Sequence, residues 1–357
     1  MIGMSSAPRS PHIAVIVTTL GRPQLLDRLL LSLTGQTLPP AQVLVMDGGG
    51  DGRTRAVVER HAVRLPVRRT AAPHGTSAAR NAGLVRLGVL DAAAVARPDP
   101  LGTLDAMLAG VPAVPPQPRR PLYEDVPLPV MVGAGGQAPE PESEPHPIDI
   151  VVFADENTWY PPDAFEAGVR VLAPPVDVLS GRMLDAEGDD ARPGAGADGP
   201  GPLDARTVWT RAAIGACLFR TGFLRAVGGF DEGLGAGCDT PWQSGAETDL
   251  LLRGLRAGKT IVFDPEVGAF GHDPDAPGPA HHARARHDAR GTGRVYRRYY
   301  DGYGCARVLV RPLGGAAKAA ARGRWAESAW YLHKAIGRLE GMTGMLLPAP
   351  PQDAPRR

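Results

Sequence analysis

Cysteine is rare in this sequence, and neither sign of charge is in excess. The three cysteines, Cys217, Cys238 and Cys305, form no CxxC pair, which argues against a structural zinc site or a disulfide framework and favours a reducing cytoplasm. The 39 basic and 38 acidic residues leave a net charge of +1. This balance gives no electrostatic reason to expect a nucleic-acid partner.

Long apolar runs and a secretory leader are also missing. No stretch reaches the roughly 18 apolar residues that a membrane-spanning helix needs. Residues 1–11 lack a basic segment followed by an apolar one, so they predict a flexible N-terminus rather than a signal peptide. We therefore expect a cytoplasmic protein without a transmembrane helix.

Short apolar runs alternate with amphipathic segments in the first 90 residues. The run 12–19 is almost continuously apolar, as in a buried parallel strand, and the leucines from Leu25 to Leu33 recur at helical spacing. The alternation predicts an α/β fold with a parallel sheet. Further strands are expected at 42–47, 67–69, 148–155, 176–182, 214–220 and 259–265, and one or two C-terminal helices between 313 and 339.

The stretch 148–162 is the most informative part of the chain. An apolar strand ends in Asp155, Glu156 and Asn157, followed by Pro161 and Pro162. Ligands bind at the carboxyl edge of open α/β sheets, and clustered oxygen ligands suit a divalent cation. We interpret this stretch as a metal-diphosphate site. The alternative is an acidic turn that caps the next helix.

Five ordered segments resemble family 2 glycosyltransferases, which have the GT-A fold. They are IVTTLGRP at 16–23, VLVMDGGGDG at 43–52, SAARNAG at 77–83, VVFADEN at 151–157, and the pair GGFDE at 228–232 with GAETDLLLR at 245–253. The resemblance implies a Rossmann-like, mixed but mostly parallel sheet flanked by helices. It also implies a glycosyltransferase of the hexosyltransferase type that uses a nucleotide-diphospho-sugar.

The expected organisation is a GT-A domain over 12–275, a helical region over 276–341 and a tail over 342–357. Residues 88–147 interrupt the family pattern with a Pro- and Gly-rich insertion, which is either a surface loop or an acceptor-side lid or docking arm. Residues 188–202 form a second low-complexity loop, which we expect to be mobile.

The resemblance also assigns site residues. Donor binding is expected from Thr18, Thr19, Arg22, Asp47, Arg80 and Asp155. A divalent metal, Mg²⁺ or Mn²⁺, is expected at Asp155, Glu156, Asn157 and His272. Because Gly48 follows Asp47 where many relatives carry a polar residue, a thymidine or guanosine diphosphate donor stays open beside uridine.

The family places its catalytic base in an acidic pair that opens a helix. Here that pair reads Ala246-Glu247, so Glu247 is the expected base and Asp249 the competing candidate. Residues two apart on a helix point about 200° from each other, so only one of them can face the acceptor. Trp242, in the loop before this helix, either stacks on an acceptor sugar or belongs to the core.

The leading interpretation is an inverting, metal-dependent transfer to a polysaccharide, a lipid-linked sugar or a small natural product. The alternatives are a nucleotidyltransferase and a catalytically degraded GT-A protein that serves as a binding or scaffold subunit. The segment 281–298 is basic, and Tyr296, Tyr299, Tyr300 and Tyr303 lie within it or shortly after it. Three interpretations of this segment stay open. It forms a solvated helix face, a diphosphate clamp, or a peripheral contact with an anionic membrane surface.

Overall fold

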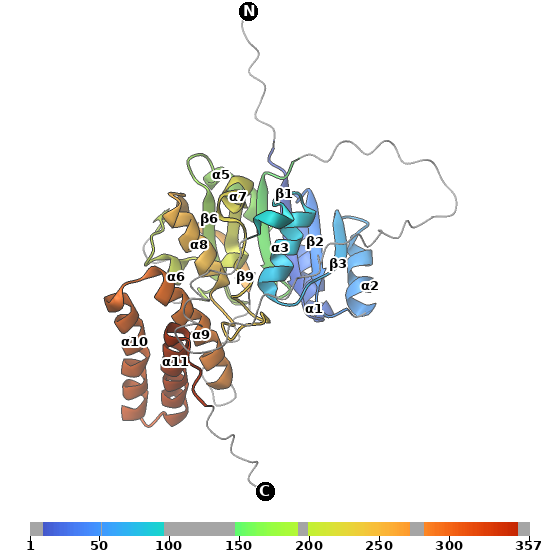
Figure 1. Ribbon diagram of the computed structural model, residues 1–357. Coiled ribbons are helices and arrows are strands. Elements are labelled where there is room, and N and C mark those ends of the chain that lie inside the picture. Colours follow the sequence, from blue (N-terminus) through green and yellow to red (C-terminus); the bar gives the residue numbers. More distant parts are fainter. Residues whose placement is uncertain (1–9, 51, 96–146, 192–198, 272–281, 349–357) are drawn as a thin grey trace, which may run out of the picture.

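Residues 10–50, 52–95, 147–191, 199–271 and 282–348 are described by a computed structural model of the chain. The strands are β1 (Ile13–Thr19), β2 (Gln42–Asp47), β3 (Val67–Ala71), β4 (Ile150–Asp155), β5 (Thr158–Trp159), β6 (Val178–Leu184), β7 (Gly201–Pro202), β8 (Cys217–Arg220) and β9 (Ile261–Gly271). They form one sheet in the order β3-β2-β1-β4-β8-β6-β9-β5, with β7 paired to β9 (Figure 1).

The sheet is parallel in its N-terminal half and mixed beyond it. Strands β1 to β4 pair in parallel, as do β6 and β9, whereas β8, β5 and β7 pair antiparallel to their neighbours. The predicted mixed, mostly parallel α/β sheet is therefore confirmed.

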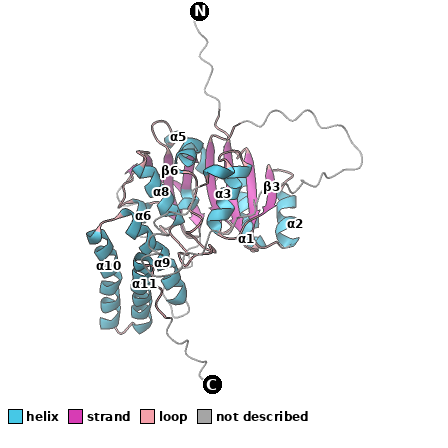
Figure 2. Ribbon diagram, viewed as in Figure 1, coloured by secondary structure: helices cyan, strands magenta, loops and turns pink. Residues whose placement is uncertain are grey.

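Helices cover both faces of the sheet (Figure 2). They are α1 (Pro23–Thr34), α2 (Gly52–His61), α3 (Thr76–Arg86), α5 (Ala164–Val171), α6 (Val208–Arg211), α7 (Thr221–Val227) and α8 (Ala246–Arg256). Strand β1 shows why two layers form, because alternate residues point to opposite faces. Val15 and Val17 share a core cluster with Leu29 of α1, whereas Ala14 and Ile16 belong to the cluster that includes α3, α7 and α8.

Two strand boundaries differ from the sequence expectation. The expected strand 214–220 begins only at Cys217, because Ile214–Ala216 forms a 3₁₀ turn. Strand β9 runs past Pro265 to Gly271, and its pairing with β6 shifts register between Ser180 and Arg182. Pro265 falls in this irregularity, where its missing N–H costs no ladder hydrogen bond.

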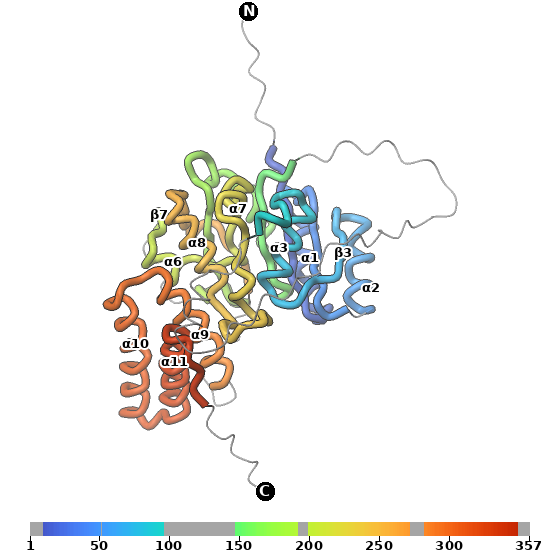
Figure 3. The backbone as a smooth tube through the Cα atoms, in the orientation of Figure 1, coloured from blue at the N-terminus to red at the C-terminus, as the bar shows by residue number. Residues whose placement is uncertain are grey.

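Three long helices follow the sheet and lie beside it (Figure 3). They are α9 (His282–Tyr299), α10 (Gly302–Ala321) and α11 (Trp325–Thr343). The sequence predicted one or two helices between 313 and 339. The predicted first residue was wrong, because α10 begins at Gly302. A proline usually marks a helix boundary, but Pro312 lies buried inside α10.

Helices α9 and α11 pack closely around a buried ion pair. A Cβ at Gly293, Gly337 or Gly341 would overlap a backbone carbonyl of the facing helix, so these glycines permit the close approach. Glu340 of α11 is fully buried and accepts hydrogen bonds from Arg286 and Arg290 of α9. Burial raises the pKa of Glu340, but these hydrogen bonds outweigh burial and lower it to about 2.

The basic segment 281–298 is therefore engaged largely inside the protein. Arg286 and Arg290 pair with Glu340, and Arg298 pairs with Asp231 and Asp249. These three arginines do not form the solvated, diphosphate-binding or membrane-facing surface that the sequence suggested. Of the described helices, none is both long and apolar enough to cross a membrane.

Candidate functional site

The carboxyl ends of β1, β2 and β4 meet at one edge of the sheet. Thr18 pairs in register with Asp155, and Thr19 pairs with Asp47. Thr18 Oγ1 also donates a 2.6 Å hydrogen bond to Asp155 Oδ1. Parallel pairing thus gathers four of the residues that the sequence assigned to donor binding.

Arg80 of α3 lies buried at this edge, with a relative exposure of 1%. Its Nη2 is 3.2 Å from Asp155 Oδ1, and its Nη1 is 2.7 Å from Glu247 Oε1. Burial pushes the pKa of Arg80 down, but the two carboxylates outweigh burial and raise it. The guanidinium therefore stays charged and joins a carboxylate of β4 to one of α8.

Glu247 lies in the first turn of α8 and remains accessible. Its side chain is 36% exposed, and that of Asp155 is 42% exposed. Gly245 precedes the helix and has a positive φ of 86°, which favours glycine. A Cβ at this position would also lie only 3.2 Å from the carbonyl oxygen of Gly291 in α9. The start of α8 is thus fixed against α9 while Glu247 stays open to a ligand.

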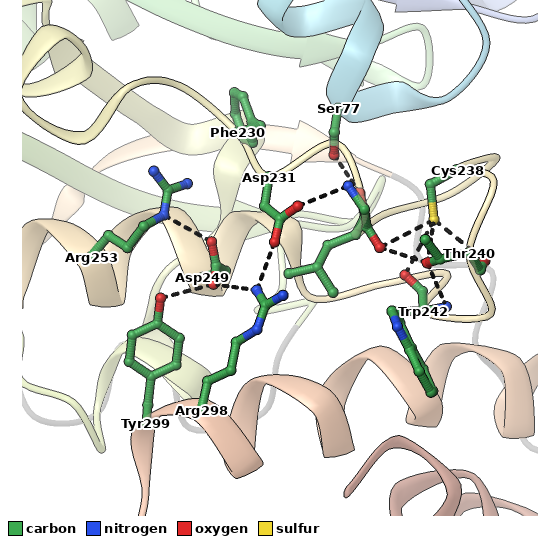
Figure 4. A network of polar contacts seen from close by, with 12 residues as sticks. Ser77, Phe230, Asp231, Cys238, Thr240, Trp242, Asp249, Arg253, Arg298 and Tyr299 are labelled. Carbon is green, nitrogen blue, oxygen red and sulfur yellow. Dashed lines mark hydrogen bonds and ion pairs between the residues drawn. The ribbon is translucent and has the colours of Figure 1, made fainter. Parts of the chain in front are cut away.

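Asp249 has a different environment, although it lies only two residues further along α8. It is buried and accepts hydrogen bonds from Arg253 Nε (2.9 Å), Arg298 Nη1 (3.2 Å) and Tyr299 Oη (2.8 Å). Arg298 also bonds to Asp231 Oδ2 at 2.7 Å. Figure 4 shows these side chains converging between α8 and α9, so Asp249 anchors the helix.

Glu156 turns away from the open edge. It is 2% exposed and accepts hydrogen bonds from Thr19 Oγ1, from the backbone N–H groups of Leu20 and Arg22, and from Arg22 Nε. These donors belong to the end of β1 and the loop that leads into α1. In this geometry Glu156 secures that loop, and Asp155 is the carboxylate that faces outward.

Asp47 and Arg22 lie at the same edge of the sheet. The buried Asp47 carboxylate accepts from the N–H groups of Gly49 and Gly50, at 2.9 and 3.1 Å, and from Arg69 Nη1 at 2.6 Å. It therefore folds the loop after β2. The Arg22 side chain is more than half exposed, although its Nε is bound to Glu156.

Trp242 belongs to a glycine-rich loop that packs on the start of α3. Ser77 Oγ donates to the Leu234 carbonyl at 2.6 Å, and Gly235 N–H donates to the Trp242 carbonyl at 3.0 Å. The Trp242 ring is half-buried against the core cluster, and Arg294 lies 5.5 Å from its centroid. The ring is held between the loop and α9 (Figure 4).

Two further residues, His272 and Asn157, were predicted as metal ligands. His272 lies outside the described residues, and Asn157 is partly exposed after Glu156. Across the described ranges, no group of three or more His, Cys, Asp or Glu side chains is arranged to hold a metal ion. At the strand ends, Asp155 is the part-exposed carboxylate that a metal ion could reach.

Several contact residues had no role assigned from sequence. Asp231, Arg298 and Tyr299 complete the anchor of Asp249, and Asn81 exchanges two hydrogen bonds with the backbone of Phe230. The spacing of Asp249 and Arg253 is a sequence signal for their i,i+4 pair. The contacts to Arg298 and Tyr299 span about 50 residues and leave no such signal.

Comparison with known proteins gives matches that agree with this fold. A model of the family described as Glycosyl transferase family 2 matches residues 14–86, from β1 to α3. Mannosyltransferase PcManGT from Pyrobaculum calidifontis, solved with GDP-Man and Mn²⁺, aligns over 93% of this chain and 88% of its own, with a TM-score of 0.52 and 16% identity. None of the curated proteins compared with the sequence matches it.

A second solved protein, TarS of S. aureus, has the same fold. Its 1–349 fragment aligns with a TM-score of 0.50 at 13% identity, over 96% of this chain and 94% of the fragment. The longer TarS structure aligns with a TM-score of 0.51 at 13% identity, over 89% of this chain, which spans 55% of that chain.

The fold is the GT-A fold of these solved glycosyltransferases. Residues 14–86 match the family model of glycosyl transferase family 2, in agreement with the resemblance found in the sequence.

Proposed function

We propose that the protein transfers a sugar from a nucleotide-diphospho-sugar to a hydroxyl acceptor, with inversion at the anomeric carbon. The observation that carries this proposal is the arrangement of Asp155 and Glu247, two part-exposed carboxylates held by opposite nitrogens of the buried Arg80. One carboxylate lies at the donor edge of the sheet, and the other opens the acceptor-side helix.

Glu247 acts as the general base in this proposal. Its carboxylate accepts the proton of the acceptor hydroxyl, whose oxygen forms a bond to the anomeric carbon as the bond to the nucleoside diphosphate breaks. Attack from the face opposite the leaving group inverts the configuration. Asp249 is buried and its carboxylate already accepts three hydrogen bonds, so it cannot take the proton of an acceptor. Glu247 is therefore the accessible acid at the start of α8.

A divalent cation fits the donor side through Asp155. Mg²⁺ is commonly held by one or two carboxylates together with substrate phosphates and water, so one outward carboxylate is sufficient on the protein side. When bound, such an ion neutralises the charge that develops on the diphosphate. Asn157 and His272 stay proposed as further ligands, whereas the buried Glu156 supports the loop behind the site.

Support for a nucleotide-sugar donor comes from PcManGT, which was solved with GDP-Man and Mn²⁺. The hydrogen bonds of Asp47 to Gly49 and Gly50 define the wall where a nucleoside would lie. Gly48 adds no polar side chain to this wall, so a guanosine or thymidine diphosphate sugar is a proposed donor beside the uridine one. A saccharide, a lipid-linked sugar or a small molecule is the proposed acceptor.

The full-length chain would be incubated with UDP-, GDP- and TDP-sugars, with and without Mn²⁺ or Mg²⁺. We expect one nucleoside diphosphate with metal to raise the melting temperature, and the matching sugar to be hydrolysed slowly. Asp155→Asn should abolish the metal-dependent shift, whereas Glu59→Gln, an exposed acid on α2, should retain it. Binding without any turnover would favour a degraded binding subunit, and no binding at all would overturn the proposal.

A further inference from the structure

Helix α10 packs against the rest of the protein with one face only. Its buried residues, Val308, Pro312, Ala316 and Ala319, recur at spacings of three and four. They face α11, which lies between α10 and α9 (Figure 3). The opposite face of α10 is the outer edge of the molecule.

The outer face carries a row of basic side chains. Arg307, Arg311, Lys318 and Arg322 are exposed and follow one another at helical spacings of 4, 7 and 4. Within the described ranges, no hydrogen bond or ion pair joins any of these four side chains to the rest of the protein. Residues 302–326 also contain no Asp or Glu, so the row is not neutralised locally.

A second row on the same face is apolar. Tyr303 is 74% exposed, Val310 is 62% exposed and Leu313 is also exposed. On a helical projection at about 100° per residue, Tyr303 and Val310 lie about 40° and 60° from Arg307, next to the basic row. Leu313 lies about 60° beyond Val310 and extends the apolar surface on the side away from the basic row. Trp325, 71% exposed, extends the apolar surface at the turn into α11.

We propose that this face of α10, together with Trp325, binds the surface of an anionic lipid bilayer. Apolar and aromatic side chains beside a row of Lys and Arg are the features of a helix that lies in a membrane interface. The chain as a whole has a net charge of +1, yet residues 302–326 hold no acidic residue and five basic ones, of which four form the row and the fifth, Arg324, pairs with Glu327. This local excess is complementary to a negative surface.

A second copy of the chain fits the same face less well. A symmetric pair built on α10 would bring two basic rows together, with no acidic side chain in 302–326 to offset them. A bilayer supplies negative headgroups for the basic row and an apolar boundary for Tyr303 and Val310. The bilayer is therefore the occupant that matches both rows.

The test is sedimentation of the full-length protein with vesicles, and it does not depend on sugar transfer. Vesicles of phosphatidylcholine with 30–40% phosphatidylglycerol (a composition of about one third anionic lipid) are compared with pure phosphatidylcholine. We expect binding to the anionic vesicles alone, and weaker binding at high salt because surface charges are screened.

Two variants separate the contributions of the rows. Each basic residue near the surface contributes a factor of about five, so Arg307→Gln with Arg311→Gln and Lys318→Gln should weaken binding about 100-fold. Val310→Ser with Leu313→Ser should also weaken it, at unchanged charge. The matched control is Arg55→Gln with Arg64→Gln and Arg68→Gln, three exposed arginines in α2, in β3 and in the turn between them, which should bind like the parent.

Each variant is first checked for an unchanged circular dichroism spectrum. Equal loss in the α10 variant and in the control would show a non-specific charge effect and overturn the proposal. Failure of the parent protein to sediment with anionic vesicles would overturn it as well. So would a concentration-dependent dimer that is lost in the Val310→Ser, Leu313→Ser variant, because the face would then belong to a second copy.

Discussion

Arg80 and Glu247 are 167 positions apart in the chain, yet Arg80 Nη1 donates a 2.7 Å hydrogen bond to Glu247 Oε1. The arginine is buried and the glutamate is part-exposed. The contact joins α3 to α8. It sets the position of Glu247 relative to the carboxylate of Asp155, which the other arm of the same guanidinium holds.

Glu247→Gln and Asp249→Asn should have opposite consequences. Removing a general base typically lowers the rate about 10²- to 10⁴-fold, so Glu247→Gln should abolish transfer with donor affinity and melting temperature unchanged. Asp249→Asn should lower the melting temperature, because it removes the buried negative charge that Arg298 and Arg253 share. Kinetics and thermal unfolding of both variants check this. If Asp249→Asn loses transfer at full stability, Asp249 is the base.

Arg80→Lys should show whether Arg80 positions the carboxylates of Asp155 and Glu247 for the reaction. A lysine amine is a single point donor and cannot bond to Asp155 and Glu247 with the two arms of a fork. We expect kcat to fall at least tenfold. The control is Arg86→Lys, near the end of the same helix, where we expect no change. Full activity in Arg80→Lys would contradict a positioning role.

Glu156→Gln should destabilise the protein more than Asp155→Asn does. Glu156 is a buried carboxylate that accepts hydrogen bonds from Thr19, Leu20 and Arg22, and leaving a buried hydrogen-bonding group unsatisfied costs about 1–3 kcal/mol. Asp155 is part-exposed, so its replacement should mainly change metal-dependent nucleotide binding. Denaturant unfolding and calorimetry of both variants measure the difference. The reverse order would show that Glu156 belongs to the ligand site.

Acid should weaken the attachment of the C-terminal helices. The pKa of Glu340 is lowered to about 2 in the folded protein, from an ordinary value of 4.5. A lowered carboxylate pKa stabilises the fold above the unfolded value, and this stability is lost as the pH falls from about 5 towards 2. Unfolding measured across this range should show the loss. Glu340→Gln should be less stable at neutral pH and should lose less on acidification.

Gly341→Ala should disrupt the contact between α9 and α11. The added methyl group would overlap the carbonyl oxygen of Arg290, which is backbone and cannot swing away. Gly314→Ala is the matched control in α10, because nothing lies within 4 Å of its Cβ position. Since alanine favours helix by up to about 1 kcal/mol over glycine, the control should be neutral or slightly more stable. Equal melting temperatures would contradict the packing argument.

The sequence was sufficient for elements whose signal is local. The apolar run of β1 and the leucine spacing of α1 predicted their positions within a residue or two. Parallel strands place their ends together, which gathered Thr18, Thr19, Asp47 and Asp155 at one edge. The prediction placed the C-terminal helices from 313 onward and missed the start of α10 at Gly302. The helix continues through the buried Pro312, and the packing that permits this is not visible in the local sequence.

The acidic strand end was predicted from its residues, but the roles within it were not. Sequence alone determined that Asp155, Glu156 and Asn157 end a buried strand. It also limited the candidates for the catalytic base at the start of α8 to Glu247 and Asp249. Only the tertiary structure turned Glu156 inward onto the β1–α1 loop, buried Asp249 against α9 and left Asp155 and Glu247 open around Arg80. Burial depends on partners distant in the chain, and neighbouring residues of the same charge carry no local sign of which will be buried.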